Sequence, residues 1–120
     1  MAYDNGNVFA RILRGEIPCK KVFENEHALA FHDIGPQAPV HVLVIPKGAY
    51  VTADEFAANA SEAELVGFMR AVAAVVAEMG LAESGYRLIA NNGGHGHQEV
   101  PHLHFHVLGG RPLGRMLERA

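Results

Sequence analysis

The chain has 120 residues, of which 49% are hydrophobic and 19% are charged, so it can form one globular domain that needs neither metals nor disulfides for stability. Ten Lys and Arg against 13 Asp and Glu give a formal net charge of −3, which argues against a duplex nucleic-acid binder with a basic face. A single cysteine is typical of proteins in a reducing compartment. The first residues lack the apolar stretch of a signal peptide. No apolar run approaches the ~20 residues that a membrane span requires. We therefore expect one domain over residues 1–120, in a soluble cytoplasmic protein that binds neither nucleic acid nor membrane.

The first part of the chain predicts one short helix and three strands. Asn7 is a good N-cap, apolar residues follow it at helical spacing, and Gly15 can close the helix. Two strand-like runs, Lys21 to Glu24 and Ala28 to His32, are separated by three polar residues and predict a hairpin. A proline-containing loop follows, and the β-branched run from His41 to Ile45 predicts a buried strand.

The second part predicts a long helix and two more strands. Thr52 begins a segment that can cap a short helix, and Ser61 to Glu64 has the spacing of a capping box at the start of a long one. Two strands, Tyr86 to Ala90 and His102 to Leu108, flank a glycine-containing loop. This order predicts an α+β fold with an antiparallel sheet of about five strands, one long helix and one or two short helices. The face of the long helix expected to be buried comprises Leu65, Phe68, Met69, Val72, Val75, Val76 and Met79.

Five of the eight histidines fall within twelve residues, at positions 95 to 106. His102, His104 and His106 alternate with large apolar residues. In a strand, residues two apart lie on one face, so the three imidazoles should share a face. The apolar residues between them should pack on the core beneath the long helix, which fixes the register.

Three interpretations of this face were weighed. The imidazoles could simply be half-exposed polar groups on a solvated sheet. They could bind zinc, although a rise of roughly 3.3 Å per residue separates the outer two Cα atoms by about 13 Å, so only a pair with a distant ligand such as His41 would suffice. They could also perform nucleophilic catalysis on phosphorus, because neutral imidazole, with a pKa of about 6.5, is both a nucleophile and, once protonated, a leaving group.

The segment from Asn91 to Gly109 resembles the signature of the histidine triad (HIT) family, in which three histidines alternate with apolar residues. The block from Ala30 to Lys47, the stretch from Phe9 to Pro18 and the tail from Gly109 to Leu113 are similar to the Hint branch, the histidine triad nucleotide-binding proteins of bacterial type. The likeness covers nearly the whole chain in the correct order.

This resemblance implies a HIT-like fold and a homodimer whose sheets join across the interface. It further implies hydrolysis of purine nucleoside phosphoramidates, with an AMP- or GMP-like ligand, a nucleotidyl-histidine intermediate and no required cofactor. His104 would be the nucleophile, His106 would contact the phosphate and assist the leaving group, and His102 and His41 would support His104. The nucleotide-binding residues implied are Asp33 at the ribose, Phe9, Phe31 and Ile34 at the base, and Asn91, Gly96, His97, Gln98 and Glu99 around the phosphate.

Several of these residues have plainer interpretations. Asp33 could be a turn-former beside a glycine, and Phe9, Phe31 and Ile34 could be ordinary core. His97 stands where many Hint proteins have glycine, so a backbone contact there must tolerate a Cβ. Glu99 stands where eukaryotic members have a serine thought to help protonate the leaving group, and an ionised glutamate cannot donate.

Alternative functions are hydrolysis of dinucleoside polyphosphates, a non-catalytic nucleotide-binding regulatory module, and a zinc protein. The remaining histidines, His27, His32 and His95, are expected to be structural or exposed, and Cys19 is expected to be half-buried without a redox role.

Overall fold

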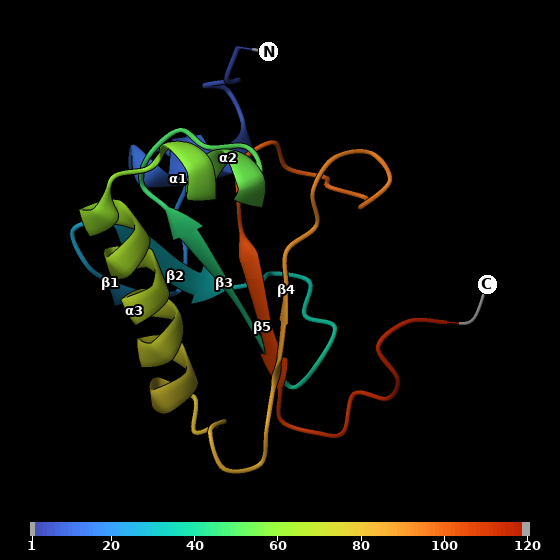
Figure 1. Ribbon diagram of the computed structural model, residues 1–120. Helices are drawn as coiled ribbons and strands as arrows, with labels where there is room; N and C mark the ends of the chain where they lie inside the picture. The colour runs from blue at the N-terminus through green and yellow to red at the C-terminus, as the bar shows by residue number, and fades with distance from the viewer. Residues whose placement is uncertain (1, 119–120) are drawn as a thin grey trace.

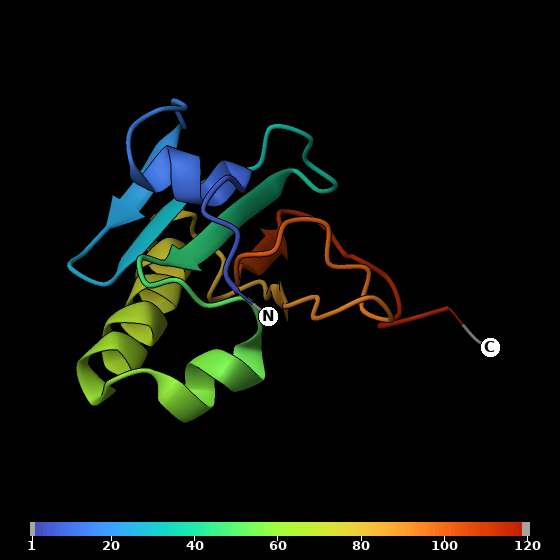
Figure 2. The ribbon, with the colours of Figure 1, turned by 90° about the horizontal axis from the view of Figure 1, so that it is seen from above.

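An antiparallel sheet of five strands, in the order β1–β2–β3–β5–β4, forms the centre of the protein. The computed structural model describes residues 2–118. Helix α3 covers one face of the sheet and α1 lies across the other (Figures 1 and 2). The α+β fold with one long and two short helices is therefore confirmed. The elements are α1 (Val8–Leu13), β1 (Lys21–Glu24), β2 (Ala28–His32), β3 (Val40–Pro46), α2 (Ala53–Asn59), α3 (Glu62–Glu78), β4 (Arg87–Ile89) and β5 (Phe105–Gly109).

The helix ends follow the local sequence signals. The Asn7 side chain accepts a hydrogen bond from a backbone N–H in the first turn of α1, and Gly15 follows that helix with a φ of 77°. Helix α3 begins with a complete capping box between Ser61 and Glu64, and Gly80 follows it with a φ of 67°. Glycine adopts a positive φ without the strain of a Cβ, so both helices stop where the sequence predicts.

The last strand differs from its prediction. β1 and β2 have the predicted bounds, and β3 is one residue longer at each end. β5, however, begins at Phe105, three residues after the predicted start at His102. The backbone N–H of Leu103 donates to the carbonyl oxygen of Tyr50 at 2.8 Å, in the connection that follows β3, so the chain before Phe105 does not join the ladder.

The sheet has an apolar core on each face. Between the sheet and α3, Leu103 and Val107 pack with side chains of β2, β3 and α3, as the alternating pattern predicts. On the other face, Phe9 of α1 packs with Phe31 and with Leu43 of β3. The chain around β5 thus places its apolar side chains towards α3 and leaves the histidines on the α1 side.

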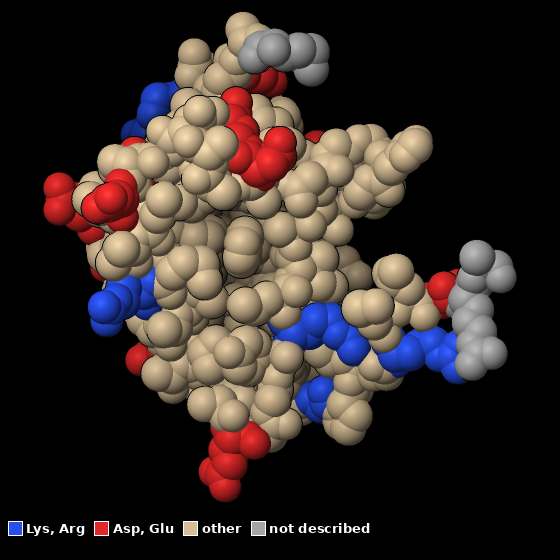
Figure 3. All heavy atoms as spheres, in the orientation of Figure 1, with Lys and Arg blue, Asp and Glu red and all other residues tan. Residues whose placement is uncertain are grey.

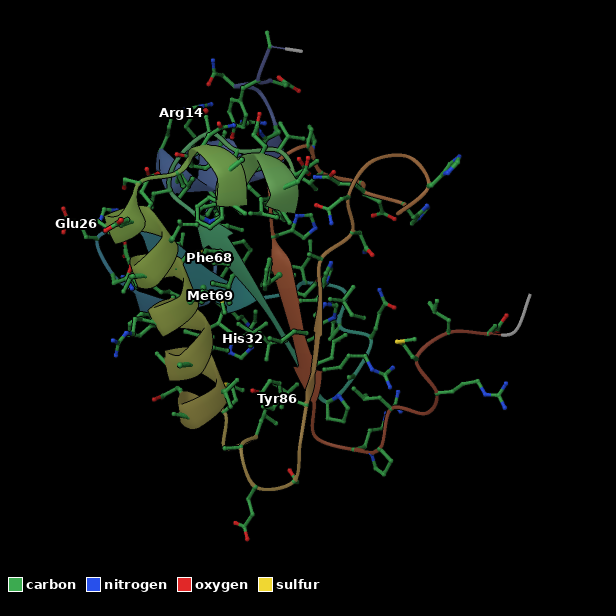
Figure 4. The ribbon with its side chains drawn as sticks, in the orientation of Figure 1. Arg14, Glu26, His32, Phe68, Met69 and Tyr86 are labelled. Atoms are coloured by element: carbon green, nitrogen blue, oxygen red, sulfur yellow. The ribbon has the colours of Figure 1, made fainter. Side chains whose placement is uncertain are left out.

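One residue of the long helix was placed wrongly by its periodicity. Met69 belongs to the expected buried face but is 51% exposed, whereas its neighbour Phe68 is 1% exposed (Figure 4). Consecutive residues of a helix differ by about 100° in direction, and the buried stripe runs through Phe68 and Ala71 instead. Met69 therefore lies off the buried stripe and faces solvent.

Charged side chains on the face drawn in Figure 3 are dispersed, and its Lys and Arg residues fall into separate groups rather than one continuous stripe. Within residues 2–118, none of the helices combines the length and the apolar character that crossing a membrane requires.

Candidate active site

His104 has one ring nitrogen occupied and one left with a lone pair. Its Nδ1 lies 2.7 Å from the carbonyl oxygen of His102. A carbonyl oxygen can only accept, so Nδ1 carries the proton and Nε2 is unprotonated. The ring is 6% exposed and packs edge-on against Phe9, with 4.9 Å between ring centroids. This burial lowers the pKa of His104 below its usual 6.5, so the ring is neutral and nucleophilic at pH 7.

His41 and His106 form a hydrogen-bonded pair whose direction is fixed from outside. The backbone N–H of Gln37 donates to His41 Nδ1 at 3.1 Å, so the proton of His41 is on Nε2. His41 Nε2 then donates to His106 Nδ1 at 2.9 Å. The proton of His106 is therefore on its own Nε2.

The Nε2–H of His106 is a buried donor without a partner among residues 2–118. Its ring centroid lies 5.0 Å from that of His104. Burial, reinforced by the neighbouring His104 and His41, lowers the pKa of His106 to about 4. Buried polar groups are nearly always satisfied, so an unpartnered donor beside a nucleophile indicates a place for an acceptor of the ligand.

His102 lies behind this pair of rings rather than beside them. Its side chain is fully buried, Nε2 donates to the carbonyl oxygen of Pro46 at 2.8 Å, and Nδ1 is hydrogen-bonded to the hydroxyl of Tyr3. Sequence reasoning missed Tyr3 and the backbone amide of Gln37 because neither belongs to a motif or a periodic pattern. The partner of Tyr3 is 99 residues away in the chain, and Gln37, although four residues before His41, acts through its backbone N–H, which a side-chain pattern does not reveal.

Asp33 makes the turn contact that the sequence allowed and also lies beside the histidines. One carboxylate oxygen accepts from the backbone N–H of Gly35 at 2.7 Å, as in a turn. The other lies 3.4 Å from His41 Nε2, which places the carboxylate beside the histidines. Burial is the larger influence on His41 and lowers its pKa, while the Asp33 charge acts in the opposite direction.

The three residues expected at the base are not gathered together. Phe9 and Phe31 are buried and pack edge to face, with 5.6 Å between ring centroids, so they form part of the core under α1. Ile34, next to Asp33, is completely exposed. An uncovered apolar side chain thus lies beside the carboxylate.

The loop before the histidines is braced by Gln98. Its Oε1 accepts from the backbone N–H of Gly93, and its Nε2 donates to the carbonyl oxygens of Val51 and Val100, at 2.9, 2.7 and 3.1 Å respectively. The side chain of Gln98 therefore holds the loop in shape. A Cβ on Gly96 would lie 2.6 Å from the carbonyl oxygen of Asn92, so only glycine fits there.

The other loop residues are more open. Asn91 is half-buried. His97 has a φ of 58°, a left-handed conformation that favours glycine, which explains why a glycine suits this position. Its exposed ring lies 3.0 Å from the exposed carboxylate of Glu99. The Glu99 charge also acts on His104 and His106, where it opposes the lowering of the pKa by burial.

Asp33, His41 and His106 each offer one ligand atom to a divalent cation, and these atoms lie within 4.8 Å of one another. The fit is poor in the present arrangement, because His41 Nε2 carries a proton and donates it to His106. A zinc ion at about 2.0–2.1 Å from each nitrogen would have to break that hydrogen bond.

Two cavities of about 560 Å³ each lie away from the histidines. One is lined by the end of α1 and by Cys19, Lys21 and Lys47. Cys19 is half-buried, and burial raises the pKa of its thiol, which keeps it unreactive. Neither cavity brings together groups suited to catalysis, so the histidine cluster is the candidate active site.

The fold is α+β, and histidines at alternate positions, one of them with a free ring nitrogen, lie on one side of its sheet. These features define a protein of the histidine triad class. The model of the HIT domain family matches residues 14–113. The chain therefore belongs to the HIT family.

Relatives of known sequence or structure agree with this assignment. The chain is 65% identical over 117 residues to a 13.2 kDa HIT-like protein of Azospirillum brasilense, covering 98% of this chain and 96% of the relative. It is 50% identical over 111 residues to the purine nucleoside phosphoramidase of Escherichia coli K12, covering 92% of each. A HIT family hydrolase from Clostridium thermocellum superimposes with a TM-score of 0.86 at 41% identity, over 95% of this chain and 99% of that one. A relative from Zea mays, 43% identical over 92% of this chain and 86% of its own length, is named a 14 kDa zinc-binding protein.

Proposed function

We propose that this protein hydrolyses purine nucleoside phosphoramidates through a nucleotide covalently attached to His104. That it is a hydrolase acting on nucleotides follows from its family and from relatives named as a hydrolase and a phosphoramidase. One observation supports chemistry at a phosphoryl group: a neutral His104 with a free Nε2 lies beside the unpartnered Nε2–H of His106. The first is a nucleophile for phosphorus, and the second is a donor for a phosphoryl oxygen.

The reaction proceeds in two displacements at the α-phosphorus. His104 Nε2 attacks, its bond to phosphorus forms, and the P–N bond to the amine breaks as the amine takes a proton from solvent. The resulting positive charge on the His104 ring is stabilised by the hydrogen bond from Nδ1 to the His102 carbonyl oxygen. Water then attacks phosphorus, the bond to Nε2 breaks, and the water proton returns to solvent, so that the products are a nucleoside monophosphate and a free amine.

In this proposal, three further residues bind or orient the substrate: His106, His41 and Asp33. The His106 Nε2–H donates to a phosphoryl oxygen in both steps, and its orientation is held by His41, whose own tautomer is set by a backbone amide. Asp33 accepts from the ribose hydroxyls, as carboxylates do in other nucleotide sites. The exposed Ile34 beside Asp33 offers an apolar surface for the base.

In this proposal, the loop before the histidines lies on the phosphate side of the bound nucleotide. We assign Asn91, Gly96, His97 and Glu99 to this side, with Gln98 as the brace that holds the loop in shape. Glu99, being ionised, attracts a cationic leaving amine rather than protonating it. The catalytic steps use no metal, because His41 and His106 are already hydrogen-bonded to each other.

We further propose that the protein belongs to the Hint branch and acts as a homodimer in the cytoplasm, joined through the edge strand β4. This strand has only three residues (Figure 1). Leu88 in the strand is 38% exposed, and Tyr86, just before it, is 44% exposed (Figure 4). Arg87 holds the C-terminal tail beside it by donating to the carbonyl oxygen of Gly114 at 2.6 Å. An exposed edge with apolar side chains is suited to pairing with a second copy.

The decisive experiment follows the covalent step. Wild-type protein mixed with adenosine 5′-phosphoramidate and quenched in alkaline denaturant, which preserves the acid-labile bond between phosphorus and a histidine nitrogen, should carry one AMP on His104, detected by peptide mass spectrometry at alkaline pH. His104→Ala should neither carry AMP nor release it. His32→Ala, at an exposed histidine at the end of β2, is the matched control and should behave as wild type. Faster turnover of diadenosine polyphosphate would instead support the dinucleoside alternative, and AMP binding without turnover would support a regulatory module.

The cofactor and the oligomer are tested separately. Turnover should persist after treatment with a chelator, and zinc should inhibit by competing for His41 and His106. Analytical ultracentrifugation should give twice the mass of the chain, and Leu88→Glu on the edge strand should give the monomer.

A further inference from the structure

The segment before α1 reaches into the back of the histidine cluster. Tyr3 lies 99 residues from His102 in sequence, yet its hydroxyl is hydrogen-bonded to His102 Nδ1 and the two rings meet edge to face, with 5.6 Å between centroids. The proposed chemistry makes no use of this tyrosine. A hydroxyl directed at a fully buried histidine nevertheless affects which ring nitrogen carries the proton.

Each hydrogen bond in the series that runs from Asn7 through Tyr3 and His102 has a fixed direction. The amide nitrogen of Asn7 can only donate, and it donates to the Tyr3 oxygen at 2.9 Å. His102 Nε2 donates to the Pro46 carbonyl oxygen at 2.8 Å, so Nδ1 is an acceptor. The Tyr3 hydroxyl must therefore donate to Nδ1. Both nitrogens of a ring with no exposed surface are satisfied in this one arrangement.

His102 also controls the nucleophile, His104, through its backbone. The carbonyl oxygen of His102 is the acceptor that holds the proton of His104 on Nδ1 and leaves Nε2 free. If the His102 ring shifted to satisfy an unpartnered Nδ1, its backbone would move with it, because the residue is enclosed on all sides. The geometry of the His104 hydrogen bond would then be lost.

We propose that Tyr3, oriented by Asn7, is a positioning residue that fixes the His102 ring and thereby maintains the reactive tautomer of His104. This inference rests on the proposed function for its kinetic consequence, but the tautomer can be measured without turnover. In this proposal, residues 2–7 contribute to the function of the site in addition to connecting to α1.

Three variants separate positioning from simple stability. Tyr3→Phe keeps the ring and removes the hydroxyl. Asn7→Asp keeps an oxygen to cap α1 but replaces the donor to Tyr3 with an acceptor that draws the hydroxyl away from His102. Tyr50→Phe is the matched control, because it removes a tyrosine hydroxyl bonded to Glu64 at the start of α3, outside the site.

The expected kinetic result is a loss in kcat with little change in KM. Tyr3→Phe and Asn7→Asp should each lower kcat for the phosphoramidate about tenfold and change KM by less than about twofold, the pattern of a supporting residue that acts on the reacting group. Tyr50→Phe should keep the wild-type kcat. Equal kcat values for all three variants and wild type, or a Tyr3→Phe that lowers only the melting temperature, would overturn the proposal.

The second readout is the tautomer itself, observed by ¹⁵N NMR of the histidine rings. Wild type should show His104 protonated at Nδ1, and Tyr3→Phe should show a measurable population protonated at Nε2, whereas Tyr50→Phe should match wild type. A tautomer shift in a protein that hydrolyses no phosphoramidate would refute the proposed function and leave the positioning role intact. Hydrolysis by wild type with unchanged kcat and unchanged tautomer in Tyr3→Phe would refute the positioning role alone.

Discussion

The buried histidines should make the protein lose stability in mild acid, and His106 allows the loss to be worked out. Burial lowers its pKa from 6.5 to about 4 in the folded protein. Well above pH 6.5 the ring is neutral whether the chain is folded or not, so it contributes nothing to the pH dependence of stability. Between these two values the unfolded chain takes up a proton that the folded protein refuses, and the free energy of unfolding falls as the pH falls. At about 1.4 kcal/mol per pKa unit, the loss from His106 reaches about 2 kcal/mol between pH ~7.5 and pH ~5.

The test compares wild type with His106→Asn by urea unfolding at both pH values and at one protein concentration. Asparagine can still accept the hydrogen bond from His41 through its side-chain oxygen, but it does not titrate. The difference in unfolding free energy between the two pH values should therefore shrink by about 2 kcal/mol in this variant. His32→Asn, at an exposed histidine, should leave the difference at its wild-type value. If His106→Asn responds to acid as wild type does, the reasoning from burial is wrong.

Three further predictions concern packing, the loop and the ribose. Leu103→Ala, at a side chain 1% exposed in the core under α3, should lower the unfolding free energy by about 2–5 kcal/mol in urea titrations. Gly96→Ala would place its Cβ 2.6 Å from the Asn92 carbonyl oxygen and should raise KM about tenfold by displacing the loop, whereas Gly94→Ala, with open space around its Cβ, should not. Asp33→Asn should raise KM for an adenosine phosphoramidate by about tenfold through the loss of charged hydrogen bonds. The same variant should change KM much less for the 2′,3′-dideoxy substrate; an equal rise for both would remove Asp33 from the ribose.

Local patterns in the sequence predicted most of the fold. The hairpin strands and the caps of α1 and α3 follow from residues within a few positions of each other, where turn chemistry and capping act. Periodicity was less reliable at boundaries. It extended the last strand back to His102, although Leu103 bonds to the Tyr50 carbonyl oxygen, and it counted Met69 as buried. The contact of Leu103 is distant in sequence, and which side of α3 meets the sheet is set by tertiary packing, so no local pattern could reveal either.

For the site, the sequence by itself determined which side chains share a face. Alternation at positions 102 to 107 sends the apolar residues to the core and the histidines to the opposite side, whatever the exact start of the strand, because the period of an extended chain is two.

Only the tertiary structure decided what each histidine can do. The proton positions of His41 and His106 depend on a backbone amide and on a contact between residues 65 apart, and that of His102 depends on Tyr3, 99 residues away. An imidazole has two chemically similar nitrogens, and its neighbours in space, not its neighbours in sequence, choose which of them reacts.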